Sequence, residues 1–263
     1  MIKTIKNGIT FAGLILAMTL CFASCGDKSK NESNIPTEYC EELVKLAEEG
    51  NAEAQANLGV CYAKGEGVSQ SNEEAVRWFK MSAEQNNAKG QFYLAMAYNR
   101  GMGVNQDWQE SLRLIKESAN QGYAKAQTQL AGCYDYGLNG ITKNHAEAMK
   151  WFRLAAEQGE PDAQWNVGMD YYTNKDYNEA FKWFDKSAAQ GYSDGQLFLG
   201  MCYFLGQGVE QDKVRGYDLV RKAAEQGNKD AIQELEDGAI TSTEKRELHQ
   251  SAVYQKTVAY LKN

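Results

Sequence analysis

One twelve-residue pattern occurs five times in this chain of 263 residues. The copies are NAEAQANLGVCY from Asn51, NAKGQFYLAMAY from Asn87, YAKAQTQLAGCY from Tyr123, EPDAQWNVGMDY from Glu160 and YSDGQLFLGMCY from Tyr192. Their shared glutamines, Gln55, Gln91, Gln127, Gln164 and Gln196, are spaced by 36, 36, 37 and 32 residues. A period of this length is typical of stacked supersecondary units, each of which buries its apolar face against its neighbours. The chain is therefore expected to be a repeat array.

Each repeat is predicted to contain two helices. In the first helix, Ala54, Leu58, Tyr62 and their counterparts recur at steps of three and four residues, which places them on one helix face. The second helix has clear start and stop signals. The N-cap residues are Ser71, Asp107, Asn144, Asp176 and Asp212, and a glutamate three residues later completes a capping box in four copies. The helix then ends at residues that tolerate left-handed backbone, Asn86, Gly122, Gly159, Gly191 and Gly227.

The order A-x-A-Q-x-x-L-G-x-x-Y, then G-x-G-V, then A-x-x-W-F-x-x-A-A-x-Q-G resembles the Sel-one-like repeat, a relative of the tetratricopeptide repeat. The resemblance covers residues 51–227. It implies an all-α fold, an α-solenoid in which antiparallel helix pairs form a right-handed superhelix, and a role in assembling or regulating protein complexes. The fourth repeat departs from the pattern, because Thr173–Ala180 lacks the glycine loop. This departure is expected to change local curvature and to leave the fold class unchanged.

The repeats and their flanks divide the chain into five parts. Residues 38–50 resemble a lone second helix, and residues 228–263 supply another first helix and a final helix, so both segments are expected to cap the open ends of the stack. The parts are a signal peptide at 1–24, a flexible tether at 25–37, the N-terminal capping helix at 38–50, five repeats at 51–227 (51–86, 87–122, 123–159, 160–191 and 192–227) and C-terminal capping helices at 228–263.

The first 25 residues have the features of an export signal. Lys3 and Lys6 precede an apolar run over residues 8–22, which is shorter than the ~20 residues that a membrane-spanning helix needs. Two small residues then precede Cys25, an arrangement that resembles the lipobox of bacterial lipoproteins, in which the cysteine is lipidated and becomes the first residue of the mature chain. Phe22 stands where that motif usually has leucine. The alternative is plain secretion with a free cysteine near the cleavage point.

The charge of the exported chain bears on its partners and location. Removing the signal takes away two of the 28 basic residues and none of the 35 acidic ones, so the net charge changes from −7 to −9. Because no basic block occurs, the electrostatic contribution to phosphate-backbone binding is missing, and nucleic acid is not expected as a partner. The predicted location is the bacterial cell envelope, through a lipid anchor. Gly26, in place of the acidic residue that retains such proteins at the inner membrane, favours the outer membrane; the side that the protein faces stays open.

A candidate binding surface follows from the tetratricopeptide resemblance, since first helices line the concave face of that fold. The stripe beside the core is apolar and aromatic in the fourth and fifth repeats, which suits an adaptable groove for a peptide or helix. The candidate residues are Phe92, Met96, Trp165, Met169, Tyr172, Leu197, Met201 and Phe204. Two alternatives stay open. In the first, these side chains pack between neighbouring repeats. In the second, they are covered by the C-terminal helix, whose apolar residues are Ala252, Val253, Val258 and Leu261.

The cysteines and histidines do not form a reactive site. Cys40 and Cys61 are equally far from the turn at Gly50–Asn51, so a disulfide between them stays open in an oxidising compartment. Cys133 and Cys202 share the column of Cys61 but belong to different repeats, and free buried thiols are expected. His145 and His249 show no metal-ligand spacing.

No nucleophile–base arrangement recurs in the sequence, so no catalytic residue, metal or cofactor is predicted. The predicted function is a non-enzymatic scaffold or adaptor of the cell envelope that binds a protein or peptide on the concave face. The alternative, from resemblance to cysteine-rich relatives linked to β-lactam binding, is a binder of or enzyme on cell-wall material, peptidoglycan or β-lactam-like.

Overall fold

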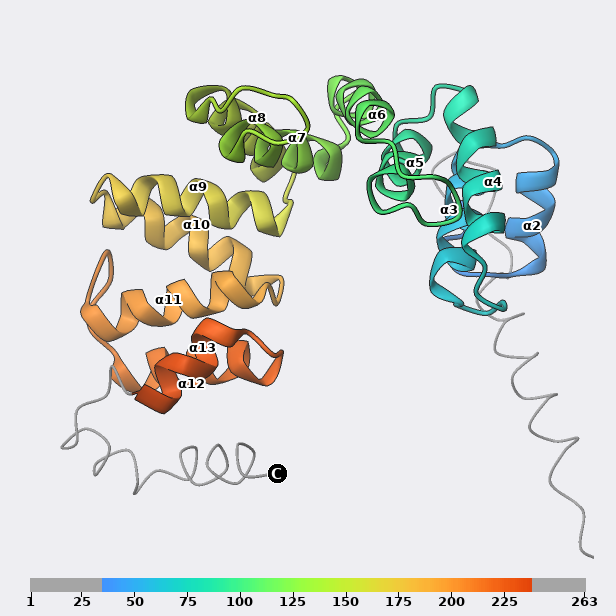
Figure 1. The fold of residues 1–263 in the computed structure, drawn as a ribbon. Coiled ribbons are helices and arrows are strands. Elements are labelled where there is room, and N and C mark those ends of the chain that lie inside the picture. Colours follow the sequence, from blue (N-terminus) through green and yellow to red (C-terminus); the bar gives the residue numbers. More distant parts are fainter. Residues whose placement is uncertain (1–34, 238–263) are drawn as a thin grey trace, which may run out of the picture. The chain divides into compact units, whose positions relative to one another are not determined.

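The computed structural model describes residues 35–237, and every regular element in this range is an α-helix. The helices fall into two compact units, divided between Gln121 and Gly122. Within each unit, successive helices pair through short turns (Figure 1), which confirms the predicted all-α fold class of repeated helix pairs. The predicted signal sequence with Cys25, and the final helix with Ala252, Val253, Val258 and Leu261, lie outside the described residues.

The first unit contains five helices in the described range 35–121. A short helix precedes two complete helix pairs, and its role as a capping element stays a prediction. The helices are α2 (Glu41–Glu48), α3 (Ala52–Lys64), α4 (Asn72–Glu84), α5 (Ala88–Arg100) and α6 (Trp108–Asn120).

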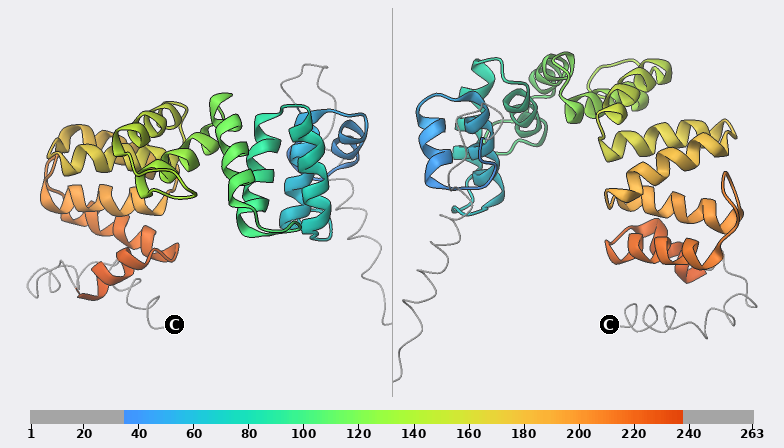
Figure 2. Two further views of the ribbon diagram at one scale, coloured as in Figure 1. Left: turned by 45° about the horizontal axis from the view of Figure 1, so that its top comes forward. Right: turned by 180° about the vertical axis from the view of Figure 1, so that it is seen from behind.

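The second unit contains three further helix pairs and one more first helix in the described range 122–237. The pairs follow one another so that α9, α10 and α11 lie in successive layers (Figures 1 and 2). The helices are α7 (Ala124–Tyr136), α8 (His145–Glu157), α9 (Pro161–Thr173), α10 (Tyr177–Ala189), α11 (Ser193–Leu205), α12 (Lys213–Glu225) and α13 (Lys229–Asp237).

The two helices of a repeat approach closely where the first one carries glycine. Gly168 of α9 lies against the Phe184 ring of α10, and a Cβ atom on this glycine would stand 2.6 Å from ring atom Cε1. Phe184 is 0% exposed, and the rings of Phe198 and Tyr172 have their centroids 5.4 and 6.1 Å from its own. This ring is therefore a centre of the apolar core in the second unit.

The predicted N-caps of the second helices are confirmed. In each of the five, the cap side chain accepts a hydrogen bond from the backbone N–H three residues on, for example Glu74 N–H to Ser71 Oγ at 3.2 Å. The second bond of a capping box, from the backbone N–H of the N-cap residue to the glutamate side chain, is not formed, so this part of the prediction is wrong. The cap's own N–H donates to a tyrosine carbonyl of the preceding helix, at 3.0 Å from Ser71 to Tyr62. The glutamates point instead to a basic residue one turn on, as in the pairs Glu74–Arg77, Glu110–Arg113, Glu147–Lys150 and Glu179–Lys182.

The glutamine that marks every repeat has a structural role. Gln55 in α3 is buried at 1% exposed, and its side-chain oxygen accepts a hydrogen bond from Gln85 at the end of α4. A buried amide left without a partner costs about 1–3 kcal/mol. This bond therefore gives the buried Gln55 oxygen of the first helix its donor, and it fixes the end of the second helix. The same bond recurs in all five repeats, as Gln85–Gln55 at 2.8 Å, Gln121–Gln91 at 2.6 Å, Gln158–Gln127 at 2.8 Å, Gln190–Gln164 at 2.9 Å and Gln226–Gln196 at 2.8 Å.

The last residues of the predicted tether pack on the first repeat. Asn57 Nδ2 of α3 donates to the carbonyl of Pro36 at 2.8 Å, and Ile35 packs against the apolar cluster that contains Leu43 and Leu58. The expectation that residues 25–37 form a flexible tether throughout is therefore wrong for residues 35–37. A buried asparagine amide needs an acceptor, and the extended backbone before α2 provides it.

Candidate partner-binding surface

The eight residues predicted to face a partner are not equally exposed. Phe92 and Leu197 are 9% and 4% exposed, so the prediction that they are available to a ligand is wrong. Leu197 packs in a cluster with Val220 of α12 and Ala231 of α13, because its position on α11 faces the next helices of the stack. The other six are partly exposed, and their binding role stays a prediction: Met96, Trp165, Met169, Tyr172, Met201 and Phe204.

Two of the aromatic candidates pack against aromatic rings of neighbouring elements in the second unit. The Trp165 ring lies 6.0 Å from that of Phe198 in α11 and 6.4 Å from that of Tyr192. Tyr172 lies 5.3 Å from Tyr177 at the start of α10, in an edge-to-face arrangement. The contacts of Trp165 are the inter-repeat packing considered as an alternative. Tyr177 belongs to the same repeat as Tyr172, whose contact with the next repeat is to the Phe198 ring, at 6.2 Å between centroids.

The remaining candidates of the second unit lie at the edge of its core. Met169 of α9 packs beside the cluster around Phe184, and Met201 and Phe204 of α11 pack beside the cluster around Val220. All three keep part of their surface exposed. Met169 and Met201 occupy the same position in successive repeats, so they place two flexible thioether side chains on neighbouring first helices.

A column of charged residues lies on the same helix face as these methionines. Asp162 and Met169 are seven residues apart on α9, as Asp194 and Met201 are on α11, which is two helical turns. The sequence analysis did not use this column, although aligning the repeats reveals it. Its members are Glu53, Lys89, Lys125, Asp162, Asp194 and Asp230.

The column forms an internal ion pair in the first unit. Lys89 Nζ of α5 lies 3.0 Å from Glu53 Oε1 of α3, and it also bonds to Asn57. Asn87, the N-cap of α5, donates a further hydrogen bond to Glu53 at 3.2 Å. The acidic side chain of this column is therefore compensated within the fold.

In the second unit, the same column brings two carboxylates together. The Tyr192 hydroxyl donates to Asp162 Oδ1 at 3.3 Å, and Asn228 Nδ2 donates to Asp194 Oδ1 at 2.6 Å. Burial raises the pKa of Asp162, and the Asp194 charge raises it further, against the hydrogen bonds from Tyr192 and Asn166. Within the described part of this unit, neither carboxylate forms an ion pair with a lysine or arginine. This edge of the surface therefore holds two carboxylates that have hydrogen-bond donors but no lysine or arginine partner within the described part of the unit.

The four described cysteines are free thiols. Cys61 is buried, and Cys40, the N-cap of α2, packs against the same apolar cluster in the first unit. Cys133 is buried in the second unit, as is Cys202, whose pKa burial raises to about 11. A thiol with such a pKa stays protonated at neutral pH and is a poor nucleophile. The disulfide between Cys40 and Cys61 is not formed in this structure.

Neither a metal site nor a membrane span is present among residues 35–237. No group of three or more potential metal-ligating side chains is suitably arranged in this range. None of the helices described there is both long enough and apolar enough to cross a bilayer.

The sequence profile of the Sel1 repeat family matches five consecutive segments, 52–87, 88–123, 124–160, 161–192 and 193–228. Together these segments make up more than half of the chain. The chain belongs to the Sel1 repeat family. Proteins of this family generally serve as protein-interaction scaffolds, and the fold is typically non-enzymatic. Protein partners are therefore the kind of ligand that the family indicates.

Solved Sel1 repeat structures are similar to this chain. A Sel1 repeat protein from Oxalobacter formigenes is 36% identical, with a TM-score of 0.65 over 74% of this chain and 57% of that one. A protective antigen of uropathogenic Escherichia coli strains that displays an SLR fold is 31% identical, with a TM-score of 0.50 over 73% and 49%. This Sel1 repeat chain thus spans about half the length of these relatives.

More distant similarity supports the fold alone. Immunity protein PA5088 from Pseudomonas aeruginosa is 22% identical, with a TM-score of 0.53 over 80% of this chain and 81% of that one. No curated protein matches the sequence.

Proposed function

We propose that this Sel1 repeat protein is a non-enzymatic scaffold of the bacterial cell envelope, anchored by a lipid at Cys25. Its binding surface is the first-helix face of the fourth and fifth repeats. The observation that carries this proposal is the pair Met169 and Met201, partly exposed on neighbouring helices and two turns from Asp162 and Asp194. Flexible thioether side chains adapt to varied apolar partners, and the family supplies protein partners as the class of ligand.

The charge beside the methionines supports a more specific partner segment. Glu53 is neutralised by Lys89 inside the first unit, whereas Asp194 stands where that lysine would be in the second. A lysine or arginine from a partner would restore the missing positive charge next to Asp162. The proposed partner segment therefore combines apolar side chains with a basic one, and charge complementarity sets its register and association rate.

The binding surface is tested by photo-crosslinking in the native host. A photoreactive amino acid replaces Met201 in one strain and Leu154 in another. Leu154 is the matched control, because it is 46% exposed on α8 of the same unit and lies outside the proposed surface. We expect one defined protein adduct from position 201 and none from position 154. Equal adducts at both positions would contradict the proposed surface.

The identified partner then allows the two contributions to be separated with purified proteins. We expect Met201→Ser to weaken binding by roughly tenfold, as loss of a central apolar contact does. Asp194→Asn should weaken binding less and reduce its dependence on salt, because it removes one charge from the surface. Leu154→Ser should leave the affinity unchanged. An affinity that both surface variants leave intact would sink the proposal.

The lipid anchor has its own test, which does not depend on the partner. Cells are fed an alkyne-tagged fatty acid, and the protein is then isolated from membrane and soluble fractions. We expect label on the native chain in the outer-membrane fraction, and no label together with a soluble protein for Cys25→Ser. A native protein that is exported without label would instead support plain secretion.

A further inference from the structure

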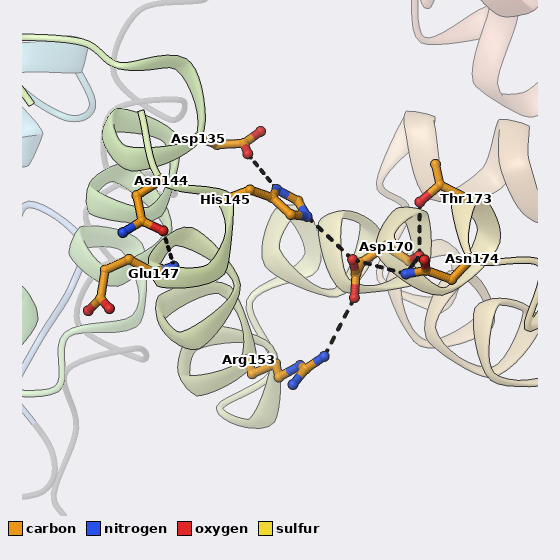
Figure 3. Close-up of polar contacts among 8 residues, drawn as sticks. All are labelled: Asp135, Asn144, His145, Glu147, Arg153, Asp170, Thr173 and Asn174. Atoms are coloured by element: carbon orange, nitrogen blue, oxygen red, sulfur yellow. Dashed lines mark hydrogen bonds and ion pairs between the residues drawn. The ribbon is translucent and has the colours of Figure 1, made fainter. Parts of the chain in front are cut away.

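His145 lies between two carboxylates that belong to different repeats. This residue begins α8, and its Nδ1 atom is 2.7 Å from Asp135 Oδ1 at the end of α7. Its Nε2 atom is 3.4 Å from Asp170 Oδ1 of α9 (Figure 3). The imidazole thus joins the third repeat, formed by α7 and α8, to the first helix of the fourth.

The charge state of the ring decides how many of these contacts it can make. An imidazolium carries a proton on both nitrogens and donates to both carboxylates. A neutral imidazole carries one proton, so its other nitrogen presents a lone pair to a carboxylate. The contact to Asp135 is the shorter one, and deprotonation is therefore expected to break the contact to Asp170.

Asp170 is an unusual occupant of its position. The corresponding residues of the other first helices are buried, apolar or weakly polar: Cys61, Ala97, Cys133 and Cys202. The Asp170 side chain is only 16% exposed, so its charge depends on nearby compensation. The guanidinium of Arg153 at 3.5 Å provides one cation, and the Asn174 amide donates a hydrogen bond at 3.4 Å. Protonated His145 is the second cation.

The other charged groups of these three helices do not take the place of this contact. On α8, Glu147 pairs with Lys150, and Glu157 lies at the opposite end of the helix from His145. Lys125 of α7 and Asp162 of α9 lie in the first turns of their helices, at the ends opposite Asp135 and Asp170. In the loop between α7 and α8, Lys143 is exposed, and it is not among the ion-pair partners of Asp135 and Asp170 in the described part of the unit.

We propose that the contact between the third and fourth repeats contains a pH-responsive tie, the ion pair of protonated His145 with Asp170, which adds to the apolar packing of α9 on α8 and is lost when the ring is neutral. The hydrogen bond with Asp135, and to a smaller extent that with Asp170, raises the pKa of His145 against partial burial. A raised pKa in the folded state means that the tie is complete below the pKa of unfolded histidine and is lost as pH rises through the folded value. Since α9 also carries Met169, a pH-dependent change in the mobility of this helix would affect the proposed binding surface.

The tie is tested on the full-length protein by NMR titration and amide hydrogen exchange. His145→Gln keeps a neutral donor at this position, and His249→Gln assigns the two imidazole signals. We expect the pKa of His145 to exceed the ~6.5 of free histidine and to fall in Asp170→Asn. Exchange is compared near pH ~5.5 and pH ~8 as protection factors, which remove the intrinsic pH dependence of the amides.

We expect the opening of α9, relative to α11, to be roughly two- to fivefold less frequent at the acidic pH, the size of one exposed ion pair. His145→Gln should abolish this difference. A His145 pKa at or below that of free histidine overturns the proposal. This measurement is made without a substitution at His145, Asp135 or Asp170. An α9 opening that is equally frequent at both pH values, with the pKa raised, overturns it as well.

Discussion

Replacing Gly208 with alanine is expected to destabilise the second unit by about 2–4 kcal/mol. Gly208 is the second glycine of the GQGV loop between α11 and α12, and its φ is +73°. A Cβ atom there would overlap the backbone carbonyl oxygen of Tyr177, at the start of α10. Because the obstacle is backbone, the loop or the helix has to move. The loss is measured as the free energy of unfolding in urea, followed by tryptophan fluorescence.

Gly191→Ala is the matched control for this prediction. Gly191 also has a positive φ, +81°, but no neighbouring heavy atom would lie within 4 Å of its added Cβ. We expect a loss of about 1 kcal/mol, from backbone strain alone. Equal losses in the two variants would show that the close approach to α10 is not what requires glycine at position 208.

The difference between these two glycines illustrates what the sequence predicts and what it does not. Both stand in repeated columns, and the need for left-handed backbone follows from their place at helix ends. The contact between Gly208 and Tyr177 joins a loop to the helix pair before it. No local pattern contains that contact, because it depends on how successive repeats stack.

The fourth repeat is a similar case. The sequence predicts the loss of the glycine loop, but not how the chain turns without it. In the structure, Lys175 adopts a φ of +64°, and the Asn174 amide donates to the carbonyl of Asp170 at 2.8 Å. The missing glycine is thus replaced by Lys175 in left-handed backbone, and the hydrogen bond from the Asn174 side chain closes the end of α9.

The candidate surface was only partly predictable for the same reason. Helical periodicity places Leu197 and Met201 on one stripe of α11, and it predicts equal exposure for both. The structure buries Leu197 under α12 and α13 and leaves Met201 partly exposed. Which half of a stripe the next repeat covers is a property of packing between repeats. The column of Asp162 and Asp194, by contrast, is visible in the sequence once charge is aligned by repeat.

Replacing Phe184 with alanine is expected to cost about 3–5 kcal/mol of the stability of the second unit. The side chain is 0% exposed, and the rings of Tyr172 and Phe198 pack around it, so its removal leaves a cavity that rigid neighbours fill poorly. Gly168 adds to this effect, because it offers no side chain to fill the space. The measurement is urea unfolding of the purified protein, with the denaturant dependence compared between variants to detect partial unfolding.

Leu205→Ala serves as the control for Phe184→Ala, since Leu205 is 54% exposed at the end of α11. We expect a change within about 0.5 kcal/mol, as for most surface substitutions. The contrast tests where the stability of the second unit resides, because the Phe184 cluster joins α9, α10 and α11 and so supports the helices that carry Met169 and Met201. Similar small losses in both variants would mean that the neighbouring rings close the cavity, and that the core of the fourth repeat is more adaptable than its burial implies.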